Sequence, residues 1–497
     1  MGRDKTDARK GLIWSTFGKV LNAGLKFLSV PLLLNHFGEE KYGLIALALS
    51  IDIYLKIMDL GFNTGNVRFI SHWLAKGKAN SIVKLVEASQ LFYGIVGLIN
   101  FSILVVLAFF SGQIFNLDPE SSEILQKLIL IISVTALFSW FFATTSHILN
   151  AYKRIDFNEK LSMVTNILIF AGVLITIGLN LSIAQYFLVY SLSIIVPIPL
   201  RILKIKTLND SISFIPRWNK EIFLEVFSYS IGIFSMGFFQ MSAQNLRPII
   251  LGIQAPITAV TEFKIIEQVA AIIIMLTSSF LSVLLPFATK YKSEGNVEAQ
   301  RKIAFDVTRY LSVFIVLLVF GLISISSPLI EVYVGKKYVH LSFWLNIWAL
   351  TLLGSHNAAL SSLILAGSNI KKISYFTAIS STLSILIAWF LAPIYSVGGV
   401  VIAFSVYILF QMIFYYIYYI PNIMNFNSGK IFVNSFLYPV IIGTGAYFIS
   451  LVISNILGFQ NPYLLIMFNG TLFVALYTSM TLCTTLKLKE IKYLLVD

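Results

Sequence analysis

The sequence is poor in cysteine and in charged residues. Cys483 is the only cysteine among 497 residues, so an internal disulfide and a cluster of thiolate metal ligands are both excluded. Charged residues make up 12% of the chain, whereas soluble globular proteins carry about 25%. Hydrophobic residues make up 57%. This balance excludes a soluble globular protein and indicates a polytopic membrane protein.

Long apolar runs recur along the whole chain, and a membrane-spanning helix needs about 20 consecutive, mostly apolar residues. The first run is too long for the core of a signal peptide and lacks a cleavage site of small residues, so we expect it to remain as a helix. The sequence therefore predicts an all-α protein with fourteen membrane-spanning helices. They cover residues 11–37, 42–66, 86–111, 124–150, 160–182, 184–204, 222–252, 257–287, 306–330, 341–366, 373–394, 397–420, 432–457 and 462–486.

Basic residues are distributed unevenly between the two sets of alternate loops. One set, together with both termini, holds most of the 36 lysines and arginines. The other set holds only Lys41, Lys127, Lys336 and Lys337. Because cytoplasmic loops carry the excess of Lys and Arg, both termini are predicted to be cytoplasmic. The net charge of +13 then reflects cytoplasmic loops, and we expect no nucleic-acid partner.

Two similar stretches indicate an internal repeat. HILNAYKRIDF (147–157) ends the fourth predicted span, and SLILAGSNIKK (362–372) ends the tenth. Since the period of six spans is even, the two halves would have parallel topology, with a central site between them. The predicted organisation is an N-terminal lobe over 11–206 (helices 1–6), a C-terminal lobe over 221–424 (helices 7–12) and two additional C-terminal helices over 432–486.

Charged side chains inside the first two spans are candidates for a site, because a charge at mid-membrane costs about 2.5–3.5 kcal/mol and usually faces a cavity. Lys19 and Lys26 are seven residues apart and share one helix face. Asp52, Lys56 and Asp59 stand at i, i+4 and i+7, so they form a polar stripe in which the lysine can pair with either carboxylate. The two helices are consecutive and antiparallel, so the stripes can face each other.

The seventh and eighth spans carry a comparable set of polar residues. One helix has two glutamines and an arginine at i, i+4 and i+7, and the next has three charged residues near its outer end: Gln240, Gln244, Arg247, Glu262, Lys264 and Glu267. Lysines and arginine along the path predict a cation-lined cavity for an anionic cargo. The four carboxylates and His147 are candidates for ion coupling or charge pairing.

Each of these groups also has a structural interpretation. Lys264 and Arg247 lie near the outer interface, where long basic side chains extend towards water. Lys56 can be a purely structural partner of a neighbouring carboxylate. His147 and His356 can be ordinary hydrogen-bond partners between helices.

Motifs of enzymes are missing from the sequence. It contains no Gly-rich phosphate loop, no HExxH pair and no GxSxG elbow, which argues against an ATP-driven pump and a hydrolase. We therefore expect no enzyme and no cofactor, with an H+ or Na+ gradient as the energy source.

Several motifs resemble those of a known family. LLLNHFGEEKYGLIALALSI (32–51) and MDLGFNTGNVRFIS (58–71) are similar to the first two helices of the polysaccharide-biosynthesis flippases, the Wzx-type O-antigen translocases. These belong to the multidrug/oligosaccharidyl-lipid/polysaccharide exporter (MOP) superfamily. Supporting similarities occur in ILNAYKRIDF, RPIILGIQAPITAVTEFKI and PLIEVYVGKKY. The resemblance touches most of residues 11–372.

The resemblance implies a flippase that moves an undecaprenyl-pyrophosphate-linked oligosaccharide from the cytoplasmic to the outer leaflet of a bacterial inner membrane, for O-antigen and lipopolysaccharide synthesis. Membrane lipids and the polysaccharide polymerase machinery would be its partners. Basic residues would then contact the pyrophosphate or the sugars, and glutamines would bind sugar hydroxyls: Lys19, Lys26, Lys56, Arg247, Gln240 and Gln244. Asn245 departs from the family, whose members often have an acidic residue there.

Two other functions remain open from the sequence. A multidrug exporter of the same superfamily would prefer an acidic cavity, which the buried lysines disfavour. A membrane polysaccharide polymerase or ligase needs a large extracytoplasmic loop, whereas the longest such connection predicted here, 111–123, is short.

Overall fold

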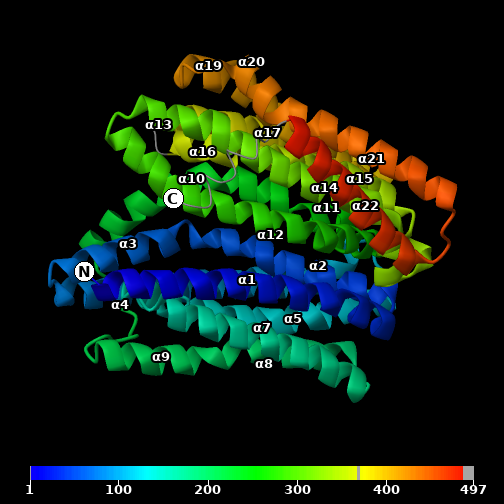
Figure 1. The fold of residues 1–497 in the computed structure, drawn as a ribbon. Coiled ribbons are helices and arrows are strands. Elements are labelled where there is room, and N and C mark those ends of the chain that lie inside the picture. The colour runs from blue at the N-terminus through cyan, green and yellow to red at the C-terminus, as the bar shows by residue number, and fades with distance from the viewer. Residues whose placement is uncertain (1, 366–369, 485–497) are drawn as a thin grey trace. The chain divides into compact units, whose positions relative to one another are not determined.

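The structure is a computed structural model that describes residues 2–365 and 370–484. Within these ranges the chain forms α-helices and short 3-10 and π-helical segments, with no β-strand (Figure 1). Within the described residues, each of the fourteen predicted apolar stretches falls mostly on a helix or on consecutive helices. The predicted all-α class is therefore confirmed.

The chain divides into two compact units, Met1–Lys264 and Ile265–Asp497. The boundary falls inside helix α12 (Ile257–Ser293), whereas the predicted lobes meet between residues 206 and 221. The proposed six-helix repeat stays a prediction, and part of its second motif, residues 366–369, lies outside the described residues.

In the first unit, the longest helices pack in pairs. α4 lies along α5 and α1 along α7, while α2 packs against α5 and α11, and α3 packs against α6 and α10. The elements are α1 (Gly2–Phe37), α2 (Glu39–Leu55), η1 (Lys56–Asp59), α3 (Phe62–Ala75), α4 (Ala79–Ile114), α5 (Pro119–Phe141), α6 (Thr144–Ala151), α7 (Ile155–Gly178), α8 (Ile183–Ile195), α9 (Pro197–Leu208), α10 (Lys220–Asn245), α11 (Arg247–Gln254) and the start of α12.

In the second unit, α14 is the helix around which several others pack, including α15, α21 and α22. The buried Tyr477 donates a hydrogen bond from its hydroxyl to the carbonyl of Val313, at 3.0 Å. The elements are α13 (Val297–Lys302), η2 (Ile303–Val307), α14 (Thr308–Val334), η3 (Lys336–Tyr338), α15 (Leu341–Leu352), η4 (Leu353–Asn357), α16 (Ala358–Leu365), α17 (Ile370–Tyr395), α18 (Val397–Ile413), η5 (Phe414–Tyr419), α19 (Ile420–Ile423), α20 (Ser428–Ile431), η6 (Phe432–Leu437), α21 (Tyr438–Leu457) and α22 (Pro462–Thr484).

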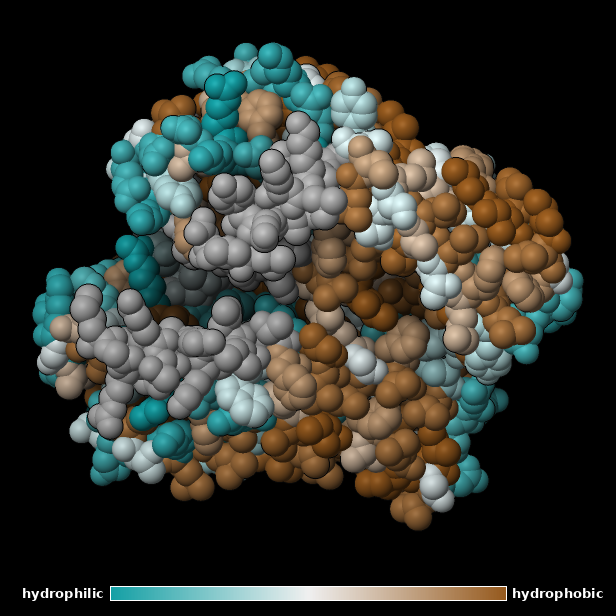
Figure 2. Space-filling model, in the orientation of Figure 1, coloured by the Kyte–Doolittle hydropathy of each residue, from teal (hydrophilic) through white to brown (hydrophobic). Residues whose placement is uncertain are grey.

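The surface and the helix lengths identify a multi-pass membrane protein. Eleven described helices are long and apolar enough to cross a membrane, or twelve if α10, bent by 54°, counts as one span. Large apolar side chains such as Phe109 and Phe390 are exposed, and Figure 2 shows broad apolar surface areas that suit contact with lipid. Two predicted spans, 42–66 and 257–287, are not among these eleven or twelve helices. The count of fourteen and the cytoplasmic termini stay predictions.

The second predicted span, 42–66, is interrupted, which differs from the expected continuous helix. α2 ends at Leu55 and continues as the 3-10 turn η1. Leu60 and Gly61 then adopt left-handed conformations, with φ of 50° and 76°, before α3 begins at Phe62. A break of this kind is tolerated at membrane depth only where protein or a cavity surrounds it.

Glycine is required at the break because α10 approaches it closely. A Cβ atom on Gly61 would lie 2.5 Å from the carbonyl oxygen of Ser230. One turn later, a Cβ on Gly65 would meet the side chains of Ser230 and Val226. The glycines of the DLGFNTG motif therefore allow α3 to pack against α10.

We predict that Gly61→Ala destabilises the protein more than Gly77→Ala. Both glycines have positive φ, at 76° and 66°, but nothing lies within 4 Å of a Cβ on Gly77. The control therefore carries only the backbone strain of about 1–2 kcal/mol, whereas Gly61→Ala adds an overpacking cost of about 1–3 kcal/mol. Thermal unfolding midpoints of the detergent-purified variants measure the difference. Equal midpoints would contradict the close packing.

We also predict the sidedness of two loops. In a Cys483→Ser background, a membrane-impermeant maleimide should label Gln113→Cys in intact spheroplasts and Ser211→Cys only after lysis. Both positions are exposed, and they lie in connections predicted to face opposite sides. The labelled fraction is measured by the mass shift of the purified protein. The reverse pattern would invert the predicted topology.

Candidate functional site

A cavity of about 570 Å³ lies within the first unit, between α2, η1, α3, α5, α8 and α10. Its volume falls in the range of about 300–1,000 Å³ that is typical of small-molecule sites. It is lined by Asp52, Lys56, Ile57, Asp59, Leu60, Gly61, Asn63, Thr64, Ile132, Thr135, Ala136, Ser139, Trp140, Ala143, Tyr190, Ile194, Ile233, Phe234, Gly237 and Met241.

Three residues predicted from the sequence line this pocket together: Asp52, Lys56 and Asp59. The Nζ atom of Lys56 lies 3.3 Å from Oδ2 of Asp52. The Lys56 side chain is 61% exposed and that of Asp52 is 19% exposed, so the ion pair forms part of an open wall. Of the two pairings that the spacing allows, the structure has the one with Asp52.

The carboxylate of Asp59 is held by the protein itself. Its Oδ1 accepts a hydrogen bond of 2.6 Å from the hydroxyl of Tyr93, and its Oδ2 accepts one of 3.2 Å from the backbone N–H of Asn63. The second bond satisfies a backbone donor in the first turn of α3, which has no partner within the helix. Asp59 therefore stabilises the interruption between α2 and α3 while it lines the pocket.

A buried polar network lies behind Asp59. The ring centre of Tyr93 is 5.6 Å from that of His147, and His147 Nδ1 lies 3.4 Å from Nδ2 of Asn66. Asn66 in turn accepts a hydrogen bond of 2.9 Å from Ser89. His147 is 5% exposed. Its position fits the hydrogen-bonding interpretation of this residue, between α3, α4 and α6.

Sequence reasoning missed Tyr93 and Ser89, the members of this network on α4. They are four positions apart, and Asn100 follows seven positions after Tyr93, so the three share one helix face. All three are buried. A search for polar side chains on one face of this apolar helix would have found them.

A second helix break lies beside the pocket. α5 ends at Phe141 and α6 begins at Thr144, so the fourth predicted span is also interrupted. The side-chain amide of Gln90 donates a hydrogen bond to the carbonyl of Phe141 at the break. Trp140 and Ala143, beside this break, lie in the pocket wall.

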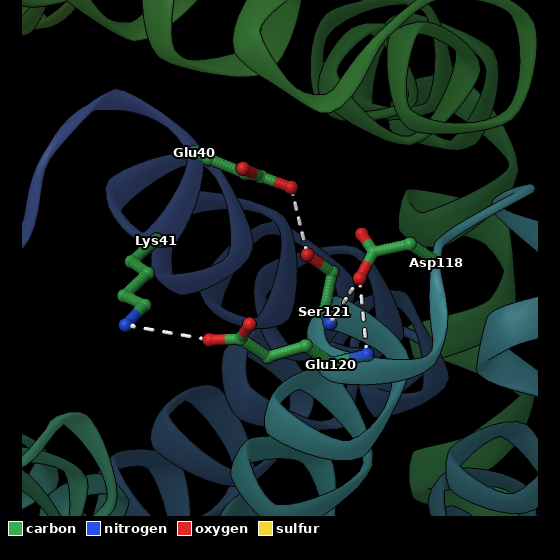
Figure 3. Close-up of polar contacts among 5 residues, drawn as sticks. All are labelled: Glu40, Lys41, Asp118, Glu120 and Ser121. Atoms are coloured by element: carbon green, nitrogen blue, oxygen red, sulfur yellow. Dashed lines mark hydrogen bonds and ion pairs between the residues drawn. The ribbon is translucent and has the colours of Figure 1, made fainter.

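Polar contacts join the N-terminal ends of α2 and α5, two helices that wall the pocket farther along (Figure 3). The hydroxyl of Ser121 donates a 2.8 Å hydrogen bond to Glu40, and Lys41 lies 3.7 Å from Glu120 in an exposed ion pair. Asp118 caps α5 by accepting from the backbone N–H groups of Glu120 and Ser121. Hydrogen bonds from Ser121, above all, hold the pKa of the Asp118 carboxyl below its usual range.

The pocket within the first unit is not rich in cations, and the cation-lined cavity predicted between the two halves stays a prediction. Its lining contains two carboxylates and one ammonium group, and the ammonium group is already paired. Lys19 and Lys26 are exposed on α1 and are not among the lining residues. The structure therefore brings one of the predicted cations into this pocket.

The remaining predicted residues lie on α10, α11 and α12. Gln240 and Gln244 are exposed near the end of α10. Arg247 is buried at the start of α11, where its Nε donates a 3.0 Å hydrogen bond to the carbonyl of Ala243. Further along, Glu262, Lys264 and Glu267 are half-buried on α12, the first two in the first unit and the third in the second. Their roles stay predictions.

The model of one protein family, described as polysaccharide biosynthesis protein, matches residues 8–292, which is more than half of the chain. No curated protein matches the chain significantly in sequence.

Solved structures show the same fold at low sequence identity. One is the lipid II flippase MurJ in an inward closed conformation, with 15% identity, a TM-score of 0.71 and coverage of 95% of this chain and 99% of that chain. Another is a multidrug resistance MATE family transporter of the MOP superfamily in an inward-facing conformation, with 12% identity, a TM-score of 0.68 and coverage of 79% and 92%. A third is a MOP superfamily transporter from Pyrococcus furiosus, with 12% identity, a TM-score of 0.57 and coverage of 81% and 93%.

The family match and the fold agree with the motifs of α2 and α3. The chain belongs to the polysaccharide biosynthesis protein family, and its fold is that of the flippases and exporters of the MOP superfamily.

Proposed function

We propose that this protein is a flippase for an undecaprenyl-pyrophosphate-linked oligosaccharide, an O-antigen or similar repeat unit. It moves the lipid-linked unit from the cytoplasmic to the outer leaflet of a bacterial inner membrane by alternating access. The observation that carries the proposal is the pocket of the first unit, which brings two carboxylates, an ammonium group and several hydroxyl and amide side chains together in a largely apolar lining, in a member of the polysaccharide biosynthesis family.

The pocket has the chemistry that a hydrophilic head group needs inside a membrane. Two interrupted helices, α2–α3 and α5–α6, contribute to its walls. Interrupted helices at membrane depth are typical of transporter binding sites, because their freed backbone groups can face a hydrated cavity. A saccharide in such a pocket would cross the membrane without exposing its hydroxyl groups to hydrocarbon.

The proposal assigns two roles to the other charged and titratable residues. Lys19, Lys26 and Arg247 provide positive charge for the pyrophosphate, which needs charge-assisted hydrogen bonds when it leaves water. Asp59 and His147 are the candidates for coupling to an H+ or Na+ gradient. Membrane lipids surround the protein, and the polysaccharide polymerase machinery takes over its product.

One observation favours a second function, an ion-coupled multidrug exporter. The pocket lining has two carboxylates against one ammonium group, and such an excess of negative charge suits a cationic drug. Multidrug transporters with the same fold also support this candidate. The following experiment distinguishes the flippase from the exporter.

Deletion of the gene in its native host should cause a complete undecaprenyl-pyrophosphate-linked repeat unit to accumulate while the surface polysaccharide disappears. The blocked step leaves the finished lipid-linked unit on the cytoplasmic side. Mass spectrometry of the lipid extract, together with surface polysaccharide staining, measures both effects. Unchanged lipids with raised sensitivity to cationic drugs would establish the exporter instead.

Lys56→Gln should lower surface polysaccharide by about tenfold in the complemented deletion strain, because it leaves the Asp52 carboxylate in the pocket without its partner. Lys160→Gln is the matched control: Lys160 lies 3.9 Å from Asp156 in the same i,i+4 arrangement on α7, outside the pocket lining. Staining normalised to the membrane level of each variant gives the comparison. In a cationic-drug exporter, removal of this ammonium group would instead preserve or increase transport.

A further inference from the structure

We propose that the pocket of the first unit binds the saccharide part of the cargo and not its pyrophosphate. This inference rests on the proposed function and assigns one part of the substrate to one set of residues. The pyrophosphate then has to be met by basic residues elsewhere, so that the two ends of the polar head group are recognised separately.

Charge argues against a pyrophosphate in this pocket. A pyrophosphate diester carries two negative charges, whereas the lining supplies one ammonium group and two carboxylates. The ammonium group of Lys56 already lies 3.3 Å from Asp52. Asp59 also lines the pocket, so an entering anion would meet like charge there.

The carboxylates are also poor sites for a cationic organic ligand. Asp52 is paired with Lys56, and both oxygens of Asp59 accept hydrogen bonds, from Tyr93 and from the backbone of Asn63. A cationic ligand would have to compete with groups that the fold holds in place. An uncharged ligand that brings hydroxyl groups adds hydrogen bonds to these carboxylates without displacing their partners.

Several polar side chains are open to such hydroxyl groups. Asn63 and Thr64 are exposed in the first turns of α3, and Ser139 and Tyr190 are half-buried in the lining from α5 and α8. Amide and hydroxyl groups both donate and accept hydrogen bonds. A sugar hydroxyl has the same dual capacity, so it can satisfy them in either orientation.

Apolar and aromatic groups complete the lining. Trp140 is stacked against Tyr93, with ring centres 5.9 Å apart, so its position in the wall is constrained from behind. Phe234 and Met241 of α10 lie in the same lining. Pyranose rings present apolar C–H faces between their hydroxyl edges, and a wall that mixes aromatic and polar groups matches both.

Binding to the full-length protein in nanodiscs tests the assignment with three defined probes. The first is the lipid-linked repeat unit purified from the deletion strain. The second is undecaprenyl pyrophosphate, which has the lipid and the anion but no sugar. The third is the free oligosaccharide released from the first probe by mild acid. Native mass spectrometry or thermophoresis gives each Kd.

The informative variant is Asp52→Asn. If the pocket holds the saccharide, loss of one charge-assisted hydrogen bond weakens binding of both sugar-containing probes by about tenfold and leaves undecaprenyl pyrophosphate unchanged. If the pocket holds the pyrophosphate, removal of this negative charge frees Lys56 and strengthens binding of the sugar-free lipid. The two assignments therefore predict that Asp52→Asn affects different probes, and that the affinity changes in opposite directions.

One further pocket variant and one control outside the pocket accompany it. Thr64→Val removes an exposed hydroxyl group without altering charge, and it should weaken the binding of the two sugar-containing probes alone. Asp156→Asn removes the carboxylate of a similar i,i+4 pair with Lys160 outside the pocket, and it should change none of the three affinities.

The outcomes separate the two levels of the proposal. If the wild-type protein binds none of the probes but binds a cationic dye, the proposed function fails. If the wild-type protein binds the lipid-linked unit, the proposed function stands. The saccharide assignment is nevertheless overturned if both pocket variants weaken the binding of undecaprenyl pyrophosphate as strongly as that of the sugar-containing probes. It is also overturned if Asp52→Asn strengthens the binding of undecaprenyl pyrophosphate.

Discussion

The structure depends on the requirement that every backbone polar group in a membrane find a partner within the protein. Continuous helices meet this requirement by themselves, and they account for most of the described chain. Where two helices are interrupted beside the pocket, side chains supply the missing partners. Asp59 accepts from the N–H of Asn63 at the start of α3, and Gln90 donates to the carbonyl of Phe141 at the end of α5.

These compensated breaks explain how charged and hydrogen-bonding groups can line a pocket among apolar helices. Asp59 and Asn63 line the pocket on the two sides of the α2–α3 break, and Tyr93 holds Asp59 from behind. Tyr93 contacts one residue beside each break, because its hydroxyl donates a hydrogen bond to Asp59 while its ring stacks against Trp140. The positions of a carboxylate and an indole in the pocket wall are thus linked through one buried tyrosine of α4.

The same arrangement defines what the pocket can recognise. Its charges are largely satisfied within the protein, through Lys56 with Asp52 and Tyr93 with Asp59. What remains open is a set of hydrogen-bonding and apolar groups, which suits a polyhydroxylated, uncharged moiety better than a phosphate or a cation. In a lipid-linked oligosaccharide, the saccharide and the pyrophosphate have different chemistry, and separate regions of the protein can recognise them.

The sequence by itself determined the helical class, the helix locations and the three charged residues of α2 and η1 that line the pocket. Apolar run length and helical spacing are local properties, so they can be read along the chain. Only the tertiary structure decided that Lys56 pairs with Asp52, that Asp59 binds Tyr93, and that Lys19 and Lys26 lie outside this lining. These outcomes depend on which helix faces meet and where helices break, and both follow from packing between distant segments, as the close approach of α10 to Gly61 illustrates.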